Sequence, residues 1–391
     1  MLIKFALSLA VDFRFRAGFK MSAKYIHVIS FNIPFPPDYG GIIDIYYKLK
    51  ALKQAGVRII LHCYSYGRQP SKELEDLCNT VHYYQRDSGP LYFLSRDPYI
   101  VSTRNAKPMP KNLFGDSFPV LFEGIHTTAL LPACSKAGKR SLVRTHNIEH
   151  DYYRALSRSE TRIFNKAFHY IESLKLRRYE SVLKYADHIL AISRPEAKYF
   201  ESVYGKTHFI PAFHRFEDIN IKPGIGSYIL FHGNLGVAEN SDVFLRLVMN
   251  VLSTTEYRVI VAGKNPPNRF ARQLNAFSNI ELIANPEDEV LDRLIQNAQV
   301  NLLYTAQSTG IKLKLLHALF SGRHCLVNRE MVEGTGLAHL CVEANHPGEM
   351  ISSLEELMKK PFSEEKISER KTALMDYSTR AGAEKIIRLL D

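Results

Sequence analysis

The stretch TGIKLKLLHALFSGRHCLVN, Thr309–Asn328, runs without interruption from a loop into a helix, a turn and a strand. It is preceded by NLLY, a short apolar strand. After Thr309 and Gly310 the apolar residues recur at helical spacing until Gly322, where the helix is expected to end, and RHCLV then has the composition of a buried strand. This order predicts two parallel strands joined by a helix that covers one face of their sheet.

The loop that enters this helix is a predicted anion site. A loop that leaves the carboxyl end of a parallel strand and enters a helix N-terminus presents unpaired backbone N–H groups, which suit an anion. Lys312 and Lys314 add positive charge at this point. An alternative interpretation is that the two lysines are solvated side chains on an ordinary βα unit.

The first half of the chain alternates strands and helices. Tyr25–Phe31 is rich in β-forming residues, a proline-rich loop follows, and a helix with an apolar stripe begins after Gly40 and Gly41. Further strands are expected at residues 57–64, 81–84, 119–122, 141–144, 188–192 and 208–210. This alternation predicts a doubly wound parallel sheet.

The pattern lapses between residues 212 and 227, and a second alternation begins at the strand YILFHG. We therefore predict an α/β chain of two Rossmann-like, doubly wound parallel-sheet domains that face each other across a cleft. The predicted parts are an N-terminal extension at 1–20, a first domain at 21–218, a second domain at 219–375, and a C-terminal helix at 376–391 that returns to the first domain.

The composition is that of a soluble globular protein, with 46% hydrophobic and 23% charged residues in a chain of 391. A net charge of +11 favours an anionic partner, which is a nucleic acid, a phosphorylated small molecule or an anionic membrane surface. The sequence contains no zinc finger, RNA-binding aromatic motif or other compact reader of nucleic acid, so we do not expect nucleic-acid binding.

The cysteines indicate the compartment. All five are scattered, and none forms a CxxC pair, which predicts free thiols in a reducing environment and hence a cytoplasmic protein. Residues 1–20 lack the cleavage site of a signal peptide, and no apolar stretch approaches transmembrane length.

One long helix, at residues 162–184, is strongly basic. Its lysine and arginine side chains are expected to face outward, where they are commonly just solvated but also suit peripheral attachment at the inner face of an anionic membrane. Its apolar residues are expected to face the core: Phe164, Phe168, Ile171, Leu174, Val182 and Leu183.

The cleft between the two domains is the predicted functional site, because open α/β sheets bind ligands outside the carboxyl ends of their strands. The candidate residues each follow a predicted strand. They are Gly40, Gly41, Glu123, His126, His146, Asn147 and Glu149 in the first domain, and Gly233, Asn234 and the stretch Thr309–His317 in the second.

The chain resembles the retaining nucleotide-sugar glycosyltransferases of the GT-B architecture, in particular family four, also called glycosyltransferase group 1. The resemblance covers residues 21–391 and rests on YGGIIDIYYKLKALKQAGVRIIL, RTHNIEHDYY, AISRPE, FHGNLGVAEN, VIVAG and TGIKLKLLHALFSG. It implies transfer of a hexose from a nucleotide-sugar donor, held by the second domain, to a saccharide or lipid-linked acceptor on the first. It further implies retention of configuration, no metal or other cofactor, and a role in the synthesis of surface polysaccharide, glycolipid or glycoconjugate.

The resemblance also implies roles for single residues. His146 is similar in position to the family's catalytically important histidine. Family members usually carry two glutamates separated by seven residues, and Thr309 and His317 stand at those positions, where they would meet the donor sugar and the ribose. The basic residue that often follows the first strand of the second domain is absent from FHGNLGVAEN, so Lys312 or Lys314 would neutralise the diphosphate.

Two alternative functions stay open. The first is a catalytically weak nucleotide-sugar-binding protein of the same fold, which Thr309 and His317 make plausible. The second is a zinc peptidase, because HNIEH (His146–His150) matches the HxxEH pattern in which two histidines on one helical face bind zinc and Glu149 acts as base. The residues SLVR before it are a predicted strand, which places His146 at a strand end and favours the transferase.

Overall fold

The computed structural model describes residues 24–105, 107–306 and 312–391. The first half contains the strands β1 (Tyr25–Ser30), β2 (Arg58–Ser65), β3 (Thr80–Gln85), β4 (Val120–Glu123), β5 (Ser141–Thr145), β6 (His188–Ala191) and β7 (Thr207–Phe209). The second half contains β8 (Ile229–Asn234), β9 (Val259–Lys264), β10 (Ile280–Ala284), β11 (Val300–Leu303), β12 (His324–Val327) and β13 (Val342–Glu343). The strands of the first half, and β8, β11 and β12 of the second, fall where the sequence predicted them, whereas the short β13 was not predicted.

Helices connect these strands. Those of the first half are α2 (Gly40–Gln54), α3 (Lys72–Leu77), α4 (Tyr99–Ser102), α5 (Met109–Leu113), α6 (Leu131–Lys136), α7 (Glu149–Ser159), α8 (Ile163–Tyr179) and α9 (Arg194–Tyr204), with η1 (Pro90–Leu94), η2 (Ile125–Leu130) and η3 (Glu180–Tyr185). Those of the second half are α10 (Ala238–Asn250), α11 (Asn268–Leu274), α12 (Asp288–Asn297), α13 (Leu313–Ser321), α14 (Arg329–Val332), α15 (Pro347–Lys359), α16 (Glu364–Ala373) and α17 (Thr379–Arg388), with η4 (Leu252–Thr254), η5 (Ala338–Leu340) and η6 (Met375–Tyr377).

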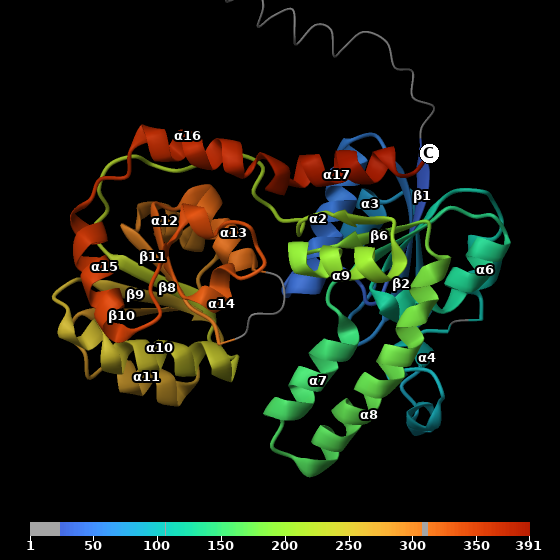
Figure 1. Ribbon diagram of the computed structural model, residues 1–391, viewed down its shortest axis with the longest axis horizontal. Helices are drawn as coiled ribbons and strands as arrows, with labels where there is room; N and C mark the ends of the chain where they lie inside the picture. The colour runs from blue at the N-terminus through green and yellow to red at the C-terminus, as the bar shows by residue number, and fades with distance from the viewer. Residues whose placement is uncertain (1–23, 106, 307–311) are drawn as a thin grey trace, which may run out of the picture.

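The strands form two separate parallel sheets (Figure 1). The first has the order β3-β2-β1-β4-β5-β6-β7 and the second the order β10-β9-β8-β11-β12-β13. In each sheet the chain order reverses once, between β1 and β4 and between β8 and β11. The predicted doubly wound α/β fold is confirmed, and such a reversal opens a crevice at the carboxyl ends of the strands, where sheets of this kind bind ligands.

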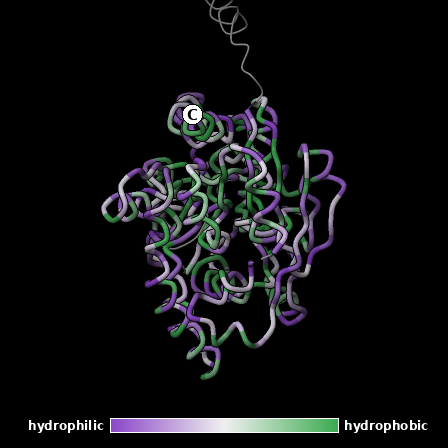
Figure 2. Tube along the Cα trace, turned by 90° about the vertical axis from the view of Figure 1, so that its right-hand side faces the viewer, coloured by the Kyte–Doolittle hydropathy of each residue, from purple (hydrophilic) through white to green (hydrophobic). Residues whose placement is uncertain are grey.

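Each sheet is buried on both faces. In β1, Val28 packs into the apolar cluster below α2, while the next residue, Ile29, packs into the cluster on the opposite face. The second sheet is covered in the same way by two further clusters. Figure 2 shows the apolar segments running through the middle of the molecule and polar ones along its outer loops. A sheet that is apolar on both sides explains why its strands are near-continuous apolar runs.

The last two helices run from the second half back to the first (Figure 1). α17 packs against α2, and Ala383 and Ile386 are buried in the core of the first half. The segment between β7 and β8, which we call the linker, contains Phe213. A Cβ at Gly382 would lie 2.9 Å from Cζ of Phe213, so only glycine lets α17 approach the linker this closely. The linker and the α16–α17 connection therefore cross between the two halves side by side.

The segment 162–184 is α8 followed by η3, and its predicted packing is partly wrong. Val182 and Leu183 are buried as predicted. Phe164, however, is 91% exposed, and Ile171 and Leu174 are about half exposed. The reason is that α8 packs against α7 as a two-helix hairpin that leaves the sheet, so one side of α8 has no layer to cover it (Figure 1).

Two further findings concern the cysteines and the helices. All five cysteines are free thiols, as predicted. No helix in the described part of the chain combines the length and the apolarity needed to cross a bilayer.

Candidate active site

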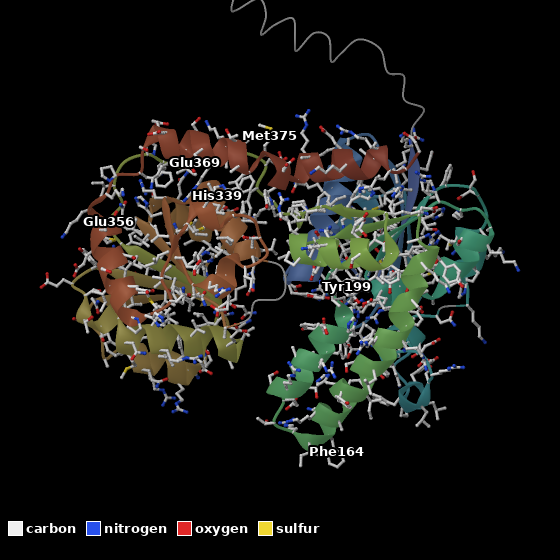
Figure 3. The ribbon with its side chains drawn as sticks, in the orientation of Figure 1. Phe164, Tyr199, His339, Glu356, Glu369 and Met375 are labelled. Carbon is white, nitrogen blue, oxygen red and sulfur yellow. The ribbon has the colours of Figure 1, made fainter. Side chains whose placement is uncertain are left out.

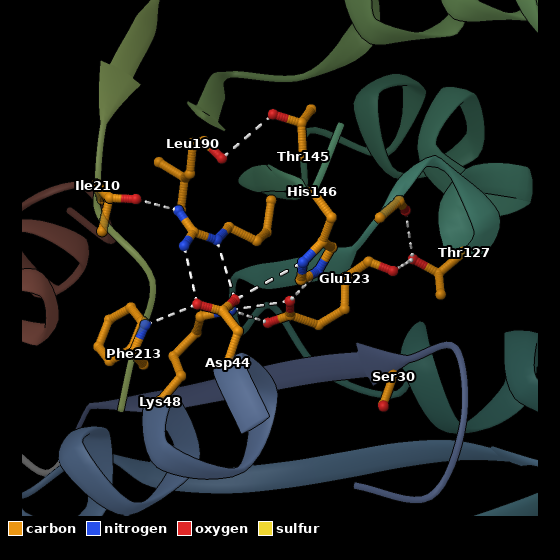
Figure 4. Close-up of polar contacts among 12 residues, drawn as sticks. Ser30, Asp44, Lys48, Glu123, Thr127, Thr145, His146, Leu190, Ile210 and Phe213 are labelled. Carbon is orange, nitrogen blue, oxygen red and sulfur yellow. Dashed lines mark hydrogen bonds and ion pairs between the residues drawn. The ribbon is translucent and has the colours of Figure 1, made fainter. Parts of the chain in front are cut away.

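Polar side chains converge at the carboxyl ends of three adjacent strands of the first sheet. β1, β4 and β5 lie side by side, Glu123 is the last residue of β4, and His146 follows β5 directly. Figure 4 shows both side chains approaching Asp44 and Lys48, which project from α2. The sheet edge and the first helix thus build the site together.

His146 is 7% exposed and lies over two carboxylates. Its Nε2 is 3.4 Å from Oε2 of Glu123, and its Nδ1 is 4.0 Å from Oδ2 of Asp44. Neither nitrogen makes a well-directed hydrogen bond within the described residues. The ring is also held edge-on against Phe31, with 5.7 Å between ring centroids. This imidazole is thus positioned by packing and charge, and neither of its buried nitrogens is engaged in a well-directed hydrogen bond in the described part of the chain.

Below His146 lies a fully buried network of four charged side chains (Figure 4). The ammonium of Lys48 donates to Asp44 Oδ2 at 2.9 Å and to Glu123 Oε1 at 2.7 Å. The guanidinium of Arg144 donates to both oxygens of Asp44, from Nε at 3.1 Å and from Nη2 at 2.9 Å. The two negative and two positive charges cancel. This pairing offsets the desolvation free energy that burying the charges costs.

The network also keeps its carboxyl groups ionised. Burial alone would raise the pKa of Asp44, but the charges of Arg144 and Lys48 outweigh burial and hold that pKa well below its ordinary value. In the same way, Lys48 lowers the pKa of Glu123 against the opposing effect of burial. His146 therefore faces carboxylates rather than neutral carboxyl groups at any physiological pH.

Arg144 and Asp44 also hold the linker between the two halves. The Nη2 atom of Arg144 donates to the carbonyl of Pro211 at 3.0 Å, and its Nη1 donates to the carbonyl of Ile210. Oδ1 of Asp44 accepts the backbone N–H of Phe213 at 2.8 Å. The histidine and the interdomain linker consequently rest on the same salt-bridge network.

Asp44, Glu123 and His146 form the one described group of three residues whose potential metal ligands lie within 4.8 Å of one another. Their geometry fits a salt-bridge network better than a metal site. The oxygens that would coordinate a cation already accept hydrogen bonds from Lys48 and Arg144, and a third positive charge would be repelled by both.

The ring of Phe31, which packs against His146, is also close to the predicted residues Gly41 and His126. Gly40 begins α2, and a Cβ at Gly41 would lie 3.0 Å from Cζ of Phe31. His126 packs against the same ring, with 5.1 Å between centroids. Burial and then the charge of Arg104 lower the pKa of His126, so it is a neutral imidazole.

Asn147 and Glu149 continue from His146 into α7. Nδ2 of Asn147 donates to Oε1 of Glu149 at 3.4 Å. Burial raises the pKa of Glu149 to about 7, with a smaller contribution from nearby Glu196, and burial raises the pKa of Glu196 to about 7 as well. This wall of the site therefore carries two carboxyl groups that titrate near neutrality.

On the opposite side, α13 begins at Leu313, directly after Lys312. Thr309 and Gly310 lie outside the described residues. Nζ of Lys314 donates to the carbonyl of Tyr304 at 2.6 Å. Burial lowers the pKa of Lys312 and of Lys314 to about 8, and the mutual repulsion of the two lysines contributes to the shift of Lys314.

Near these lysines, Glu239 in the first turn of α10 fixes the loop after β11. Its Oε1 accepts the hydroxyl of Thr305 and the backbone N–H of Ala306, both at 2.8 Å. Its charge also acts on Lys312 and Lys314 and favours their protonated forms. Glu239 thus holds the chain that leads into the predicted anion site.

His317, Gly233 and Asn234 belong to the interior and the edge of the second half. Nε2 of His317 is 2.7 Å from Oδ1 of Asp292, and its ring stacks on Phe216 with 4.2 Å between centroids. Gly233 and Asn234 end β8, where the carbonyl of Asn234 accepts Nδ2 of Asn240 at 2.9 Å. The side chain of His317 therefore already contacts Asp292 of α12, on the side of α13 that faces the linker.

A cleft of about 320 Å³ lies between the two halves. Of the predicted residues, Asn147 lines it from the first half and Lys312 from the second. Outside its lining lie His146, His317, Gly40, Gly41, Gly233 and Asn234. Other lining residues are Ile148, Tyr152, Ser193, Glu196, Phe209, Leu315, Leu316, Glu333, Thr335 and Tyr377. The structure therefore brings β5, α7 and α9 of one half face to face with α13 of the other.

The HxxEH pattern does not form a common metal-binding face. His146 precedes α7, whereas His150 is inside it. Nδ1 of His150 is 2.9 Å from Oε2 of Glu180, away from the carboxylates below His146. The two histidines thus serve different carboxylates.

Sequence analysis missed four members of the site: Asp44, Lys48, Arg144 and Phe31. A signal for them exists in the sequence. Arg144 is a charged residue inside a predicted buried strand, and Asp44 and Lys48 are an i,i+4 ion pair on the apolar stripe of a helix. Charges at positions that burial should exclude imply a partner charge elsewhere in the chain.

The chain is similar in sequence to one curated protein at least. No protein-family model matches the chain. A protein of Klebsiella pneumoniae, described as an uncharacterized 44.6 kDa protein in the cps region, is 27% identical over 342 residues, which is 80% of this chain and 85% of that protein.

Several solved structures superpose along nearly the whole chain. Sucrose-phosphate synthase from Thermosynechococcus elongatus does so with a TM-score of 0.63 and 14% identity, covering 94% of this chain and 98% of that one. A glycosyltransferase from Rickettsia africae gives 0.61 at 13% identity with the same coverages, 94% and 98%. The UDP-forming α,α-trehalose-phosphate synthase from Burkholderia xenovorans gives 0.59 at 12% identity, again over 94% and 98%. The molecule therefore has the GT-B architecture of two facing parallel-sheet domains.

Proposed function

We propose that the chain is a glycosyltransferase that moves a hexose from a nucleotide-sugar donor to a saccharide or lipid-linked acceptor, with retention of configuration. One observation carries the proposal. A single cleft is walled on one side by Asn147, next to His146 and its neutralised charge network, and on the other by Lys312 at the start of α13. A polar positioning group facing a cationic helix N-terminus suits a substrate that joins a neutral sugar to a diphosphate.

The donor is proposed to bind the second half through its diphosphate. Lys312 and Lys314 supply positive charge at the N-terminal end of α13, where the helix dipole adds to it. Two lysines and a helix terminus neutralise a diphosphate without a cation, so we propose that no metal is required. His317 would meet the ribose only by exchanging its contact with Asp292 for one with the nucleotide.

The role proposed for His146 is to position the donor sugar. In a retaining transfer the acceptor hydroxyl attacks the anomeric carbon on the face from which the diphosphate departs. The bond from that carbon to the phosphate oxygen breaks as the bond to the acceptor oxygen forms, and the departing phosphate oxygen takes the acceptor proton. An imidazole held over Glu123 and Asp44 can hydrogen-bond the sugar without entering this proton transfer.

The product is proposed to be a surface polysaccharide, glycolipid or glycoconjugate. The support is the relative from Klebsiella pneumoniae, which is described as lying in the cps region. A cytoplasmic enzyme that uses cytoplasmic nucleotide sugars fits this proposal, as do the five free thiols.

The proposal is tested by incubating the protein with a panel of UDP-, GDP- and ADP-sugars and measuring slow donor hydrolysis. We expect one donor to be hydrolysed, and His146→Ala to lower that rate by about a hundredfold, on the order of 3 kcal/mol, with nucleotide affinity nearly unchanged. Hydrolysis of no donor, combined with no thermal stabilisation by any of the three diphosphates, would remove the donor class.

His150→Ala is the matched control. It removes the other histidine of HNIEH, which pairs with Glu180 and Asp151 rather than with the carboxylates below His146, and it should lower donor hydrolysis far less than His146→Ala does. A zinc peptidase would need both histidines and would contain a stoichiometric metal that chelators remove.

A catalytically weak binding protein is the second candidate. It is favoured by the internal contacts of two predicted donor ligands, Lys314 with Tyr304 and His317 with Asp292. Tight binding of one nucleotide sugar without hydrolysis or transfer would select this candidate.

A further inference from the structure

α7 and α8 form a hairpin that projects away from both sheets (Figure 1). The turn between them is closed by Glu160, whose Oε1 accepts the backbone N–H groups of Thr161 and Arg162 at 2.9 Å. Its Oε2 accepts Nδ2 of Asn165. The tip of the hairpin is thus an ordered turn.

Large apolar side chains lie open on this hairpin. Ile163 and Phe164, at the tip, are 80% and 91% exposed, and Figure 3 shows Phe164 pointing away from the rest of the molecule. Tyr170, Ile171 and Leu174 are about half exposed further along α8. Single exposed apolar residues are common, but a run of them along one helix marks an interaction site.

The neighbouring helix η1 extends the same surface. Leu91 and Leu94 are 78% and 85% exposed. Phe93 packs edge-on against Phe168 of α8, with 5.5 Å between centroids, and its carbonyl accepts Nζ of Lys175 at 2.9 Å. η1 and α8 together hold eight of the seventeen large apolar side chains that are exposed in the described residues. We call the side chains of Leu91, Leu94, Ile163, Phe164, Ile171 and Leu174 the hairpin surface.

The charge around the hairpin surface is positive. Arg158, Arg162, Lys166, Arg177 and Arg178 are all exposed on α7, the tip and α8. The acidic groups of α8 and the tip are used internally, since Glu172 is buried against Lys175 and Tyr99 while Glu160 closes the turn. The exposed side of the hairpin therefore offers apolar groups and cations, with few anions between them.

We propose that the hairpin surface docks on an anionic lipid bilayer. A convex tip with an exposed phenylalanine and isoleucine enters the boundary between headgroups and acyl chains, and the surrounding arginines and lysine meet the lipid phosphates. The surface is convex, and the exposed charges around it are of one sign. Its complementarity to anionic lipid headgroups therefore favours the bilayer over a protein partner. The basic segment 162–184 had suggested attachment by charge alone, whereas the structure assigns the anchoring contact to apolar side chains.

The geometry also names the acceptor class, and this step rests on the proposed function. α7 begins at the cleft, where Asn147, Asp151 and Tyr152 form the wall, and ends at the tip. Its 11 residues span roughly 16 Å at 1.5 Å per residue. With the hairpin surface on the bilayer, the cleft lies at most about that far from it, which suits an acceptor sugar carried on a phospholipid-like anchor.

The test is co-sedimentation of the full chain with vesicles of phosphatidylcholine alone or mixed with phosphatidylglycerol, without donor or acceptor. We expect binding to the mixed vesicles only, and a loss of at least tenfold in partitioning for the double variant Ile163→Asp, Phe164→Asp. Met249→Asp is the matched control, because Met249 is 69% exposed on α10 of the other half and should behave as wild type. Both variants change exposed residues, so both should retain the wild-type thermal midpoint.

Three results would overturn the inference. They are no binding of the wild type to anionic vesicles, binding of the double variant equal to that of the wild type, or a wild-type dimer in solution that becomes a monomer in the double variant. The last result would make the hairpin surface an interface between copies of this chain. Donor hydrolysis in solution should be the same for wild type and the double variant. Failure of vesicle binding with hydrolysis intact would therefore reject only the docking surface, whereas failure of hydrolysis with vesicle binding intact would reject only the proposed function.

Discussion

Lys312 and Lys314 are cations whose charge depends on pH in the range where enzymes work. Burial lowers the pKa of each to about 8, so both are largely protonated at pH 7 and lose their charge as the pH rises through 8. If they hold the donor diphosphate, the dissociation constant of the matching nucleoside diphosphate should rise about tenfold or more between pH 7 and pH 9. Isothermal titration calorimetry at several pH values measures this.

Lys314→Ala should weaken the same nucleotide about tenfold to a hundredfold at pH 7, and should flatten the pH dependence. An unchanged affinity, with the pH dependence intact, would leave Lys314 with the structural task of bonding the carbonyl of Tyr304.

Glu149 gives a prediction about stability. Burial raises its pKa in the folded protein to about 7, above the ordinary value of 4.5. A raised folded pKa means that the native state holds the proton more tightly than the unfolded chain, so this stabilisation is fully present below pH 4.5 and is lost as the pH rises through 7.

Glu149→Gln cannot ionise, so it should be nearly neutral at pH 5 and stabilising at pH 8.5, by up to about 3 kcal/mol. Urea unfolding of both proteins at the two pH values measures the difference. The same change in free energy of unfolding at both would show that this carboxyl group ionises in the folded protein as it does in the unfolded chain.

Residues of the site differ in how far the sequence predicts them. His146 and Asn147 could be found because they follow a recognisable strand in a sheet that binds ligands at that edge. Asp44 and Arg144 could not, because they are 100 residues apart and only the sheet order places α2 beside β5. Which charges meet is decided by tertiary structure, and the sequence shows only that each must have a partner.

At the scale of elements, α2, β4 and β5 are joined by the buried charge network, and Asp44 is the residue on which both cations depend. Asp44→Asn keeps the shape of the side chain but leaves Lys48 and Arg144 with one carboxylate between them. We expect a loss of about 3–5 kcal/mol in the free energy of unfolding of the first half, because an uncompensated buried charge is costly.

Glu356→Gln is the control for this prediction. It removes an i,i+4 ion pair with Lys360 in which both side chains are about half exposed or more, and such solvent-screened pairs add little to stability. If Asp44→Asn lowered the free energy of unfolding in urea no more than Glu356→Gln does, the network would not be required for stability.

The elements themselves show why periodicity predicts helices better than it predicts their buried faces. α13 lies within the predicted segment, and its apolar residues Leu316 and Phe320 are buried against the second sheet. In α8 the same kind of pattern failed, since Phe164 faces solvent while Glu172 is buried. Spacing records that a helix has an apolar side, but only the presence of a neighbouring layer makes that side the inner one.

At the scale of the whole molecule, the two sheets have separate apolar cores connected by the linker and by the crossing from α16 to α17. Because each half has its own apolar core, we expect each to unfold as its own unit. Nucleotide binding and the C-terminal helix should therefore act on different unfolding transitions, since the proposed donor site is in the second half and α17 packs on the first.

Calorimetry should consequently resolve two transitions. The matching nucleoside diphosphate at about 100 times its dissociation constant should stabilise only the second half, by about 2.7 kcal/mol. Ile386→Ala should destabilise only the first half, by about 2–5 kcal/mol, because Ile386 is fully buried in its core although it lies near the end of the chain. A single transition that the nucleotide and Ile386→Ala shift in opposite directions would show that the linker contacts of Arg144 and Asp44 couple the halves into one cooperative unit. In that case His146 and the donor site would be linked through the same network that holds the histidine in place.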